Sequence, residues 1–346
     1  MKEIKLEDFT IVPILSSLRR VDMSDEEYFS KTYQDYVSNS RLKNINPNEG
    51  GSPALYKNPP HFSTSSLEIG SAVHECLLQP EEFELAPKLS KPTAKLGTCV
   101  DAIIKFRKQG FSIYDSIIKA SYEADYYAGR LTPSKIHTII EKGLPYYMAQ
   151  KSLKGTEITL SDPDWDTATK CIKSLQNNQI IMDKLHPTTM FGDTIPSYNE
   201  DAMFIDYAVL YQGRSIILKY KMKIDNWTID KDNKVLTLND LKTSFKPVNW
   251  FMNPEYGSFA HYHYARQFAF YSDVLRMYCM KEYGYNQNEW DFKANVLVVS
   301  TSEECSSKCY AINPTQIKKG RKEYKELLKR VAYYEMFGYD EEVKFV

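Results

Sequence analysis

Two acids and a lysine, placed on two successive segments, are the residues of this sequence whose types and spacing best suit chemistry. Asp225 ends the run KYKMKID, and Asp240 and Lys242 belong to the following run VLTLNDLK. Apolar and polar residues alternate in the second run, so Asp240 and Lys242 lie on one face of a strand. The turn-rich residues 226–233 predict an antiparallel strand pair with Asp225 close to Asp240. We therefore expect a metal site with a lysine beside it.

Asp225 followed by Asp240-Leu241-Lys242 resembles the signature of the PD-(D/E)XK nuclease superfamily. Three further motifs, in the same order along the chain, resemble those of its RecB/RecE-like branch, which includes phage and prophage exonucleases of the exodeoxyribonuclease VIII type. The first is a Ser-x-Ser-x-Leu helix followed by a proline and an aromatic residue: Ser38, Ser40, Leu42, Pro53 and Tyr56. Without the resemblance, this stretch predicts a capped helix and a turn.

The second motif is Gly70-x-x-x-His74, which resembles a metal-ligand motif of these exonucleases. Apolar residues recur at helical spacing around it and place His74 on the buried stripe of a helix. A histidine there is either a hydrogen-bonded core residue or, as the resemblance implies, a ligand of a divalent metal.

The third motif is Gln267-x-x-x-Tyr271, which resembles the Gln-x-x-x-Tyr motif that follows the lysine in RecB-family nucleases. We expect it on a long helix from about residue 258 to 283, where a spacing of four puts both side chains on one face. The alternative is a polar and an aromatic residue at the edge of the core.

The resemblance implies an α/β fold of restriction-endonuclease type, with a mixed β-sheet core flanked by helices. We expect a single nuclease domain over residues 1–346, with a large helical insertion at 86–196 whose helices cover about 93–108, 113–127, 132–151 and 163–185. The expected activity is divalent-metal-dependent hydrolysis of DNA phosphodiester bonds. An exodeoxyribonuclease of phage-type recombination, replication or repair is favoured over a structure-specific endonuclease and over an inactive DNA-binding or assembly protein.

Site roles follow from the same resemblance. Asp225, Asp240, the Leu241 carbonyl and His74 would hold Mg²⁺ or Mn²⁺, which prefer hard oxygen ligands. Lys242 would hold or deprotonate the attacking water, with its pKa lowered by the metal and by burial. Gln267 and Tyr271 would position Lys242 or the DNA backbone. Glu200 and Glu68 are candidate outer acids.

DNA contacts are expected from a row of lysines that leads into the site. Lys219, Lys221 and Lys223 share one face of a strand predicted over 214–225, and they form either a phosphate track or a solvated face. Ser40 and Arg41 are further candidates for DNA contact.

Composition limits the remaining classes. A net charge of −1 over 346 residues argues against a protein that coats nucleic acid by bulk charge. No stretch is long and apolar enough for a membrane span, and no signal peptide is evident, so we expect a cytoplasmic protein, in a bacterial host if phage-encoded. The six cysteines lack the spacing of a zinc site and the late cysteine set of an iron–sulfur relative, so we expect no such cluster. DNA is the expected partner; a recombination or single-strand-binding protein and a second copy of the chain are further candidates.

Overall fold

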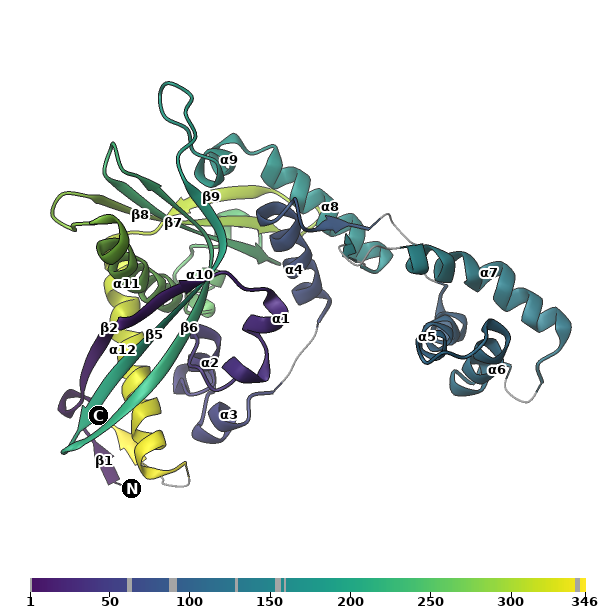
Figure 1. The fold of residues 1–346 in the computed structure, drawn as a ribbon, viewed down its shortest axis with the longest axis horizontal. Helices are drawn as coiled ribbons and strands as arrows, with labels where there is room; N and C mark the ends of the chain where they lie inside the picture. Colours follow the sequence, from purple (N-terminus) through teal and green to yellow (C-terminus); the bar gives the residue numbers. More distant parts are fainter. Residues whose placement is uncertain are drawn as a thin grey trace. The chain divides into compact units, whose positions relative to one another are not determined.

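The chain divides into two compact units (Figure 1). The computed structural model describes residues 2–60, 64–86, 92–127, 130–152, 157–158, 160–339 and 343–346. The first unit comprises Met1–Ser63 and Lys173–Val346, and the second comprises Thr64–Ile172. The predicted helical insertion, 86–196, overlaps the second unit but differs from it at both ends.

The described part of the first unit is built on a six-stranded mixed sheet in the order β2-β5-β6-β7-β8-β9. Its strands are β2 (Thr10–Val21), β5 (Ser197–Tyr211), β6 (Arg214–Asp230), β7 (Val235–Ser244), β8 (Asp291–Ser300) and β9 (Ser307–Ala311). Neighbouring strands are antiparallel, except that β7 and β8 are parallel. The short strands β1 (Lys2–Ile4) and β10 (Val343–Phe345) pair with each other near the two ends of the chain.

Helices pack against this sheet and confirm the predicted α/β class. They are α1 (Asp25–Tyr28), α2 (Asn39–Lys43), α3 (Pro53–Lys57), α9 (Gln179–Leu185), α10 (Ser258–His261), α11 (Tyr264–Tyr283) and α12 (Pro314–Phe337). The long helices α11 and α12 pack closely, because a Cβ at Gly320 of α12 would lie only 1.8 Å from the Ala265 carbonyl oxygen. Buried aromatic side chains of the sheet and of both helices meet in the core, among them Tyr220, Phe270 and Tyr324.

The strand β2 was not predicted from the sequence. The short helix α1 follows β2, and the Ser24 hydroxyl caps it by accepting a hydrogen bond from the Glu27 amide. β2 pairs with β5 at the edge of the sheet, but its register shifts between Ile14 and Arg19. The shift breaks the two-residue period by which a strand is recognised in sequence.

The strand β6 is longer than predicted. Residues 226–233 were expected to be a turn, whereas β6 continues to Asp230 and only the next few residues reverse the chain. The side chain of Asn226 explains the difference, because it belongs to a row of amides across the sheet. Its Nδ2 donates to Asn199 Oδ1 at 2.7 Å, its Oδ1 accepts from Asn239 Nδ2 at 2.7 Å, and Asn239 Oδ1 accepts from Asn295 Nδ2 at 2.9 Å.

Residues with positive φ shape two further parts of the first unit. The Gln212-Gly213 turn between β5 and β6 has positive φ at both residues, as a two-residue hairpin turn requires. The long helix expected over 258–283 is divided at His263, whose φ of 52° is left-handed, into α10 and α11. The strands β9 and β10, which follow β8 in the chain, were not predicted.

The second unit is mainly helical. Its elements are α4 (Ser65–Leu78), α5 (Ala94–Lys108), α6 (Ile113–Glu123), α7 (Pro133–Ser152) and the two-residue strands β3 (Glu84–Leu85) and β4 (Glu157–Ile158), while α8 (Asp162–Gln176) runs across the boundary between the units. The four predicted helices are confirmed to within a few residues, except that the last is split into α8 and α9. Cys99, Ile103, Ile117 and Ile139 form part of a separate core between α5, α6 and α7. None of the described helices has the length and apolar character needed to cross a membrane.

Candidate active site

The predicted acids meet where the pairing of β6 with its neighbours is interrupted. One edge of β6 pairs with β7 from Asn226 onward and with Val37 at Tyr220, so Asp225 lies between these two pairings. On the other edge, the register with β5 skips Asp225 and the opposing Glu200, whose φ is 52°. Residues held in unusual backbone conformations often cluster at functional sites, where the surrounding structure maintains the strain.

Asp225 and β7 remain connected through a side chain rather than through the strand ladder. Asp225 Oδ2 accepts a hydrogen bond from the Leu241 amide at 2.7 Å. This bond places the Asp225 carboxylate beside the stretch that carries Asp240 and Lys242, in agreement with the predicted proximity of the two acids. Asp225 lies within β6, however, and not at its end.

Three oxygen atoms converge on the ammonium group of Lys242. Lys242 Nζ lies 2.6 Å from Asp240 Oδ2, 3.2 Å from the Leu241 carbonyl oxygen and 3.9 Å from Asp225 Oδ2. The two carboxylates and the carbonyl are therefore all within reach of one positive charge. A set of hard oxygen ligands gathered around one point fits Mg²⁺ or Mn²⁺.

The other oxygen of Asp240 is held by helix α11. Gln267 Nε2 donates to Asp240 Oδ1 at 2.7 Å, and both side chains are buried. Tyr271, one turn later on α11, interacts with Gln267 through its side chain and is also buried. The predicted pair thus lies together on one face, and Gln267 contacts the acid rather than Lys242.

Tyr264 also belongs to this group, and the sequence analysis missed it. Its ring centre lies 5.3 Å from Lys242 Nζ, and the residue begins α11. Tyr264, Gln267 and Tyr271 are three and four residues apart, so they share one helix face. Extending the Gln-x-x-x-Tyr motif back by one turn would have identified it.

The acids hold the pKa of Lys242 above its ordinary value. Burial by itself lowers this pKa, but the negative charges of Asp240 and Asp225 outweigh the effect. A lysine between two carboxylates keeps its proton, and the lowered pKa expected for Lys242 beside a bound metal stays a prediction. Burial raises the pKa of Asp225, while Lys242 and the Leu241 amide oppose the shift.

Glu200, a candidate outer acid, is held by an ion pair. Its Oε2 lies 2.7 Å from Lys223 Nζ. Burial and the nearby charge of Asp225 raise its pKa to about 7. Glu68 and His74 both lie on α4 in the second unit, where His74 is half-buried. Their proposed roles stay predictions.

The lysine row does not form an open phosphate track. Lys221 is only 7% exposed, and its Nζ donates to the Tyr28 carbonyl oxygen at 2.7 Å. Lys223 forms ion pairs with Asp25 and Glu200. The protein itself therefore occupies two of the three lysines predicted to bind DNA, whereas Lys219 is exposed.

The Ser38 motif anchors the N-terminal segment beside β6. Ser38 accepts a hydrogen bond from the Arg41 amide at 3.2 Å and so caps α2, while Ser40 is exposed. The guanidinium of Arg41 lies 4.6 Å from the ring centre of the buried Tyr56. The motif therefore has a clear structural role, and contact of Ser40 and Arg41 with DNA stays a prediction.

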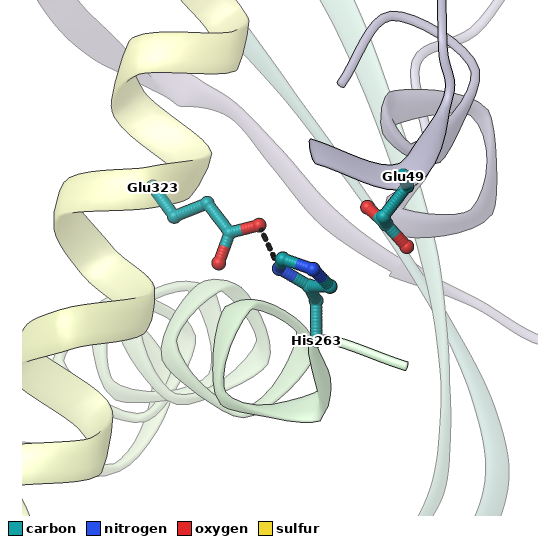
Figure 2. Close-up of side chains that lie close together, drawn as sticks. All are labelled: Glu49, His263 and Glu323. Atoms are coloured by element: carbon teal, nitrogen blue, oxygen red, sulfur yellow. Dashed lines mark hydrogen bonds and ion pairs between the residues drawn. The ribbon is translucent and has the colours of Figure 1, made fainter. Parts of the chain in front are cut away.

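A second group of acids and a histidine, shown in Figure 2, also brings metal-binding residue types together. Glu49, His263 and Glu323 come from three separate elements, and His263 Nδ1 lies 2.7 Å from Glu323 Oε1. The buried Arg266 forms ion pairs with both glutamates. Asn46 Nδ2 also donates to both carboxylates, at 2.8 and 3.0 Å. Since these carboxylates already neutralise a buried guanidinium, we assign the group to a structural ion-pair network.

Comparison with known proteins places the chain in a family. A family model described as "PDDEXK-like domain of unknown function (DUF3799)" matches residues 38–336. A crystal structure from Eubacterium rectale, described as a "putative exonuclease", aligns over 93% of this chain and 89% of its own, with 12% identity and a TM-score of 0.48. A protein from Vibrio cholerae aligns over 79% of this chain and 57% of its own, with 11% identity and a TM-score of 0.16. No curated protein sequence matches the chain. The family model covers the Asp-x-Lys hairpin, the Ser38 motif, His74 and the Gln267 helix, and the chain belongs to this PDDEXK-like family of the PD-(D/E)XK nuclease superfamily.

Proposed function

We propose that this chain is a Mg²⁺- or Mn²⁺-dependent deoxyribonuclease that removes nucleotides from DNA ends. The observation that carries the proposal is the convergence of Asp240, Leu241 and Asp225 oxygens on the single positive charge of Lys242. The group retains both acids and the lysine, and so differs from an inactive relative that has lost one of them.

We assign a separate role in hydrolysis to each residue of the site. Asp225, Asp240 and the Leu241 carbonyl would hold the divalent ion, with His74 of α4 as a further ligand. When bound, such an ion supplies positive charge to the phosphate and lowers the pKa of a water molecule. If the carboxylates held the ion, the Lys242 ammonium would leave its contact with Asp240 and would hydrogen-bond the attacking water or the phosphate.

Gln267 would keep Asp240 in the orientation that this arrangement needs. Its amide fixes Oδ1 of Asp240, which leaves Oδ2 directed at the position that Lys242 Nζ now occupies. Supporting hydrogen bonds of this type typically change metal affinity or activity by 10- to 100-fold. Tyr271 supports Gln267 in turn.

The mode of attack is tested with two DNA forms. Purified protein is incubated with Mg²⁺ or Mn²⁺ and either end-labelled linear DNA or a covalently closed circle of the same sequence. An exonuclease releases short labelled products from the linear DNA and leaves the circle intact. Cutting of the circle at a similar rate would replace this proposal with an endonuclease, and no cleavage of either form would contradict the proposed nuclease activity.

A further inference from the structure

The segment between β7 and α11, residues 245–262, exposes several large aromatic side chains. They are Phe245 at 84%, Trp250 at 53%, Tyr256 at 48% and Tyr262 at 49% exposure. Single exposed aromatic residues are normal on protein surfaces, but a group on one short segment marks an interaction site. We call residues 245–262 the aromatic segment.

The exposed aromatic side chains are not explained by a disordered or poorly packed loop. Phe251 and Phe259 of the same segment are buried at 0% and 6% exposure and pack against Tyr264. The backbone is also tightly folded at Gly257, where an added Cβ would lie 2.4 Å from the Asn253 carbonyl oxygen. The buried residues of the segment thus hold its backbone against the core, and this fixes the positions from which the exposed rings project.

Both ends of the aromatic segment meet the candidate active site. Phe245 follows Lys242 by three residues, a span of at most about 10 Å. At the other end, the Tyr262 ring centre lies 5.7 Å from that of Tyr264, and the Tyr264 ring centre lies 5.3 Å from Lys242 Nζ. A DNA strand held at Lys242 would therefore pass next to this segment.

Two of the exposed aromatic residues, Trp250 and Tyr256, contact each other, and lysines lie beside the segment. The rings of Trp250 and Tyr256 are 5.6 Å apart, and Lys246 Nζ donates to the Tyr256 carbonyl oxygen. Lys308 Nζ, from β9, donates to Asn249 Oδ1 at 2.8 Å. Exposed rings beside lysines, with Glu255 as the only acid in the segment sequence, are the combination that binds single-stranded nucleic acid.

We propose that the aromatic segment stacks on unpaired bases of the DNA strand that is cut at the Asp225–Asp240–Lys242 site. The proposal rests on the nuclease function proposed above and adds the form of the substrate: a strand whose bases are unstacked from their complement as it enters the site. Base–aromatic stacking is tolerant of sequence, because every base has a π face. No preference for particular bases is expected.

The test compares an ordinary single-stranded oligonucleotide with an abasic one of the same length, which keeps the phosphates but lacks bases. Binding is measured in Ca²⁺, which can occupy hard oxygen sites and often does not support cleavage in this superfamily. Wild-type protein should bind the ordinary strand more tightly than the abasic strand. Phe245→Ala and Trp250→Ala should each weaken binding of the ordinary strand about fivefold or more and leave binding of the abasic strand unchanged.

Phe191→Ala is the matched control, since Phe191 has the same 84% exposure but lies outside the aromatic segment. It should bind both strands like the wild type. Equal binding of the ordinary strand by all variants overturns the stacking proposal, and so does an equal loss on both strands. Self-association that is lost in Phe245→Ala, with DNA binding unchanged, would assign the segment to contact with a second copy instead.

The result separates this inference from the proposed function. If Phe245→Ala and Trp250→Ala both bind DNA and cleave linear DNA like the wild type, the stacking proposal is wrong and the proposed nuclease function is unaffected. Absence of cleavage by the wild-type protein removes the proposed function itself.

Discussion

Gln267 donates a 2.7 Å hydrogen bond to one oxygen of Asp240, while the other oxygen lies 2.6 Å from Lys242 Nζ. The acid is thus fixed from two sides, by the helix α11 and by its own strand. We expect Gln267→Leu to lower metal affinity or cleavage by 10- to 100-fold, because the leucine keeps the volume but frees Asp240 to rotate. Tyr271→Phe should have a smaller effect of the same sign. Metal titration, a cleavage assay and a thermal melt of each variant measure these effects. Full activity of Gln267→Leu would show that the contact with Asp240 does not support metal binding or cleavage.

His74→Ala tests whether α4 contributes a metal ligand. We expect weaker Mg²⁺ or Mn²⁺ binding and lower activity with little change in melting temperature, since His74 is only half-buried. A core histidine would give the reverse result, a lower melting temperature with an unchanged metal titration.

The lysines of the row are expected to differ in their contribution to DNA binding. Lys219→Ala should weaken binding of all DNA sequences and reduce the salt slope by about one unit, because its charge is exposed. Lys221→Met is the control. Lys221 is buried and donates to the Tyr28 carbonyl oxygen, so its substitution should leave the salt slope unchanged. The measurement is DNA affinity in Ca²⁺ at several salt concentrations. A slope that changes with Lys221 but not with Lys219 would reverse the assignment.

The Arg266 network should matter for stability. Arg266→Met leaves Glu49 and Glu323 without their buried counter-charge, for which we expect a loss of about 3–5 kcal/mol in the free energy of unfolding. Lys322→Ala is the control on the same helix as Glu323, because Lys322 is 81% exposed and its surface ion pair with Glu326 contributes about 1 kcal/mol at most. Urea denaturation measures both. Stabilisation of the wild type by added Zn²⁺, lost in His263→Ala, would show that the group holds a metal instead.

The strand β2 shows why part of the fold could not be predicted from sequence. Ser17 Oγ accepts a hydrogen bond from the Asp206 amide at 2.8 Å and donates to the Ile14 carbonyl at 2.7 Å, so a side chain replaces part of the strand ladder. Pro13 is also part of β2, which is tolerated at a sheet edge. Neither feature produces the alternating pattern on which strand prediction relies.

Asn226 shows the same limit near the site. Asparagine favours turns because its side chain can hydrogen-bond the local backbone. Here its amide bonds to neighbouring strands instead, and no local pattern indicates those partners. By contrast, the Asp225, Asp240 and Lys242 group was predictable, because strand alternation and the motif order both placed it. Tyr264 was within reach of the same helical spacing, one turn before Gln267, whereas the position of Glu200 opposite Asp225 depends on strand register.

The assignment of Asp225 and Asp240 as metal ligands is tested by cleavage of end-labelled linear DNA. Wild-type protein, Asp225→Asn and Asp240→Asn are each assayed with Mg²⁺ and with a chelator. Asparagine keeps the size of each side chain and an oxygen that can still accept a hydrogen bond, from the Leu241 amide at position 225 and from Gln267 at position 240, so folding should be retained. We predict cleavage by the wild type that requires the metal, and a loss of at least about 100-fold in both variants, since removing a ligand charge costs several kcal/mol of transition-state stabilisation. Cleavage by both variants within about tenfold of wild type, or full activity of the wild type in the chelator, would contradict the metal-site assignment.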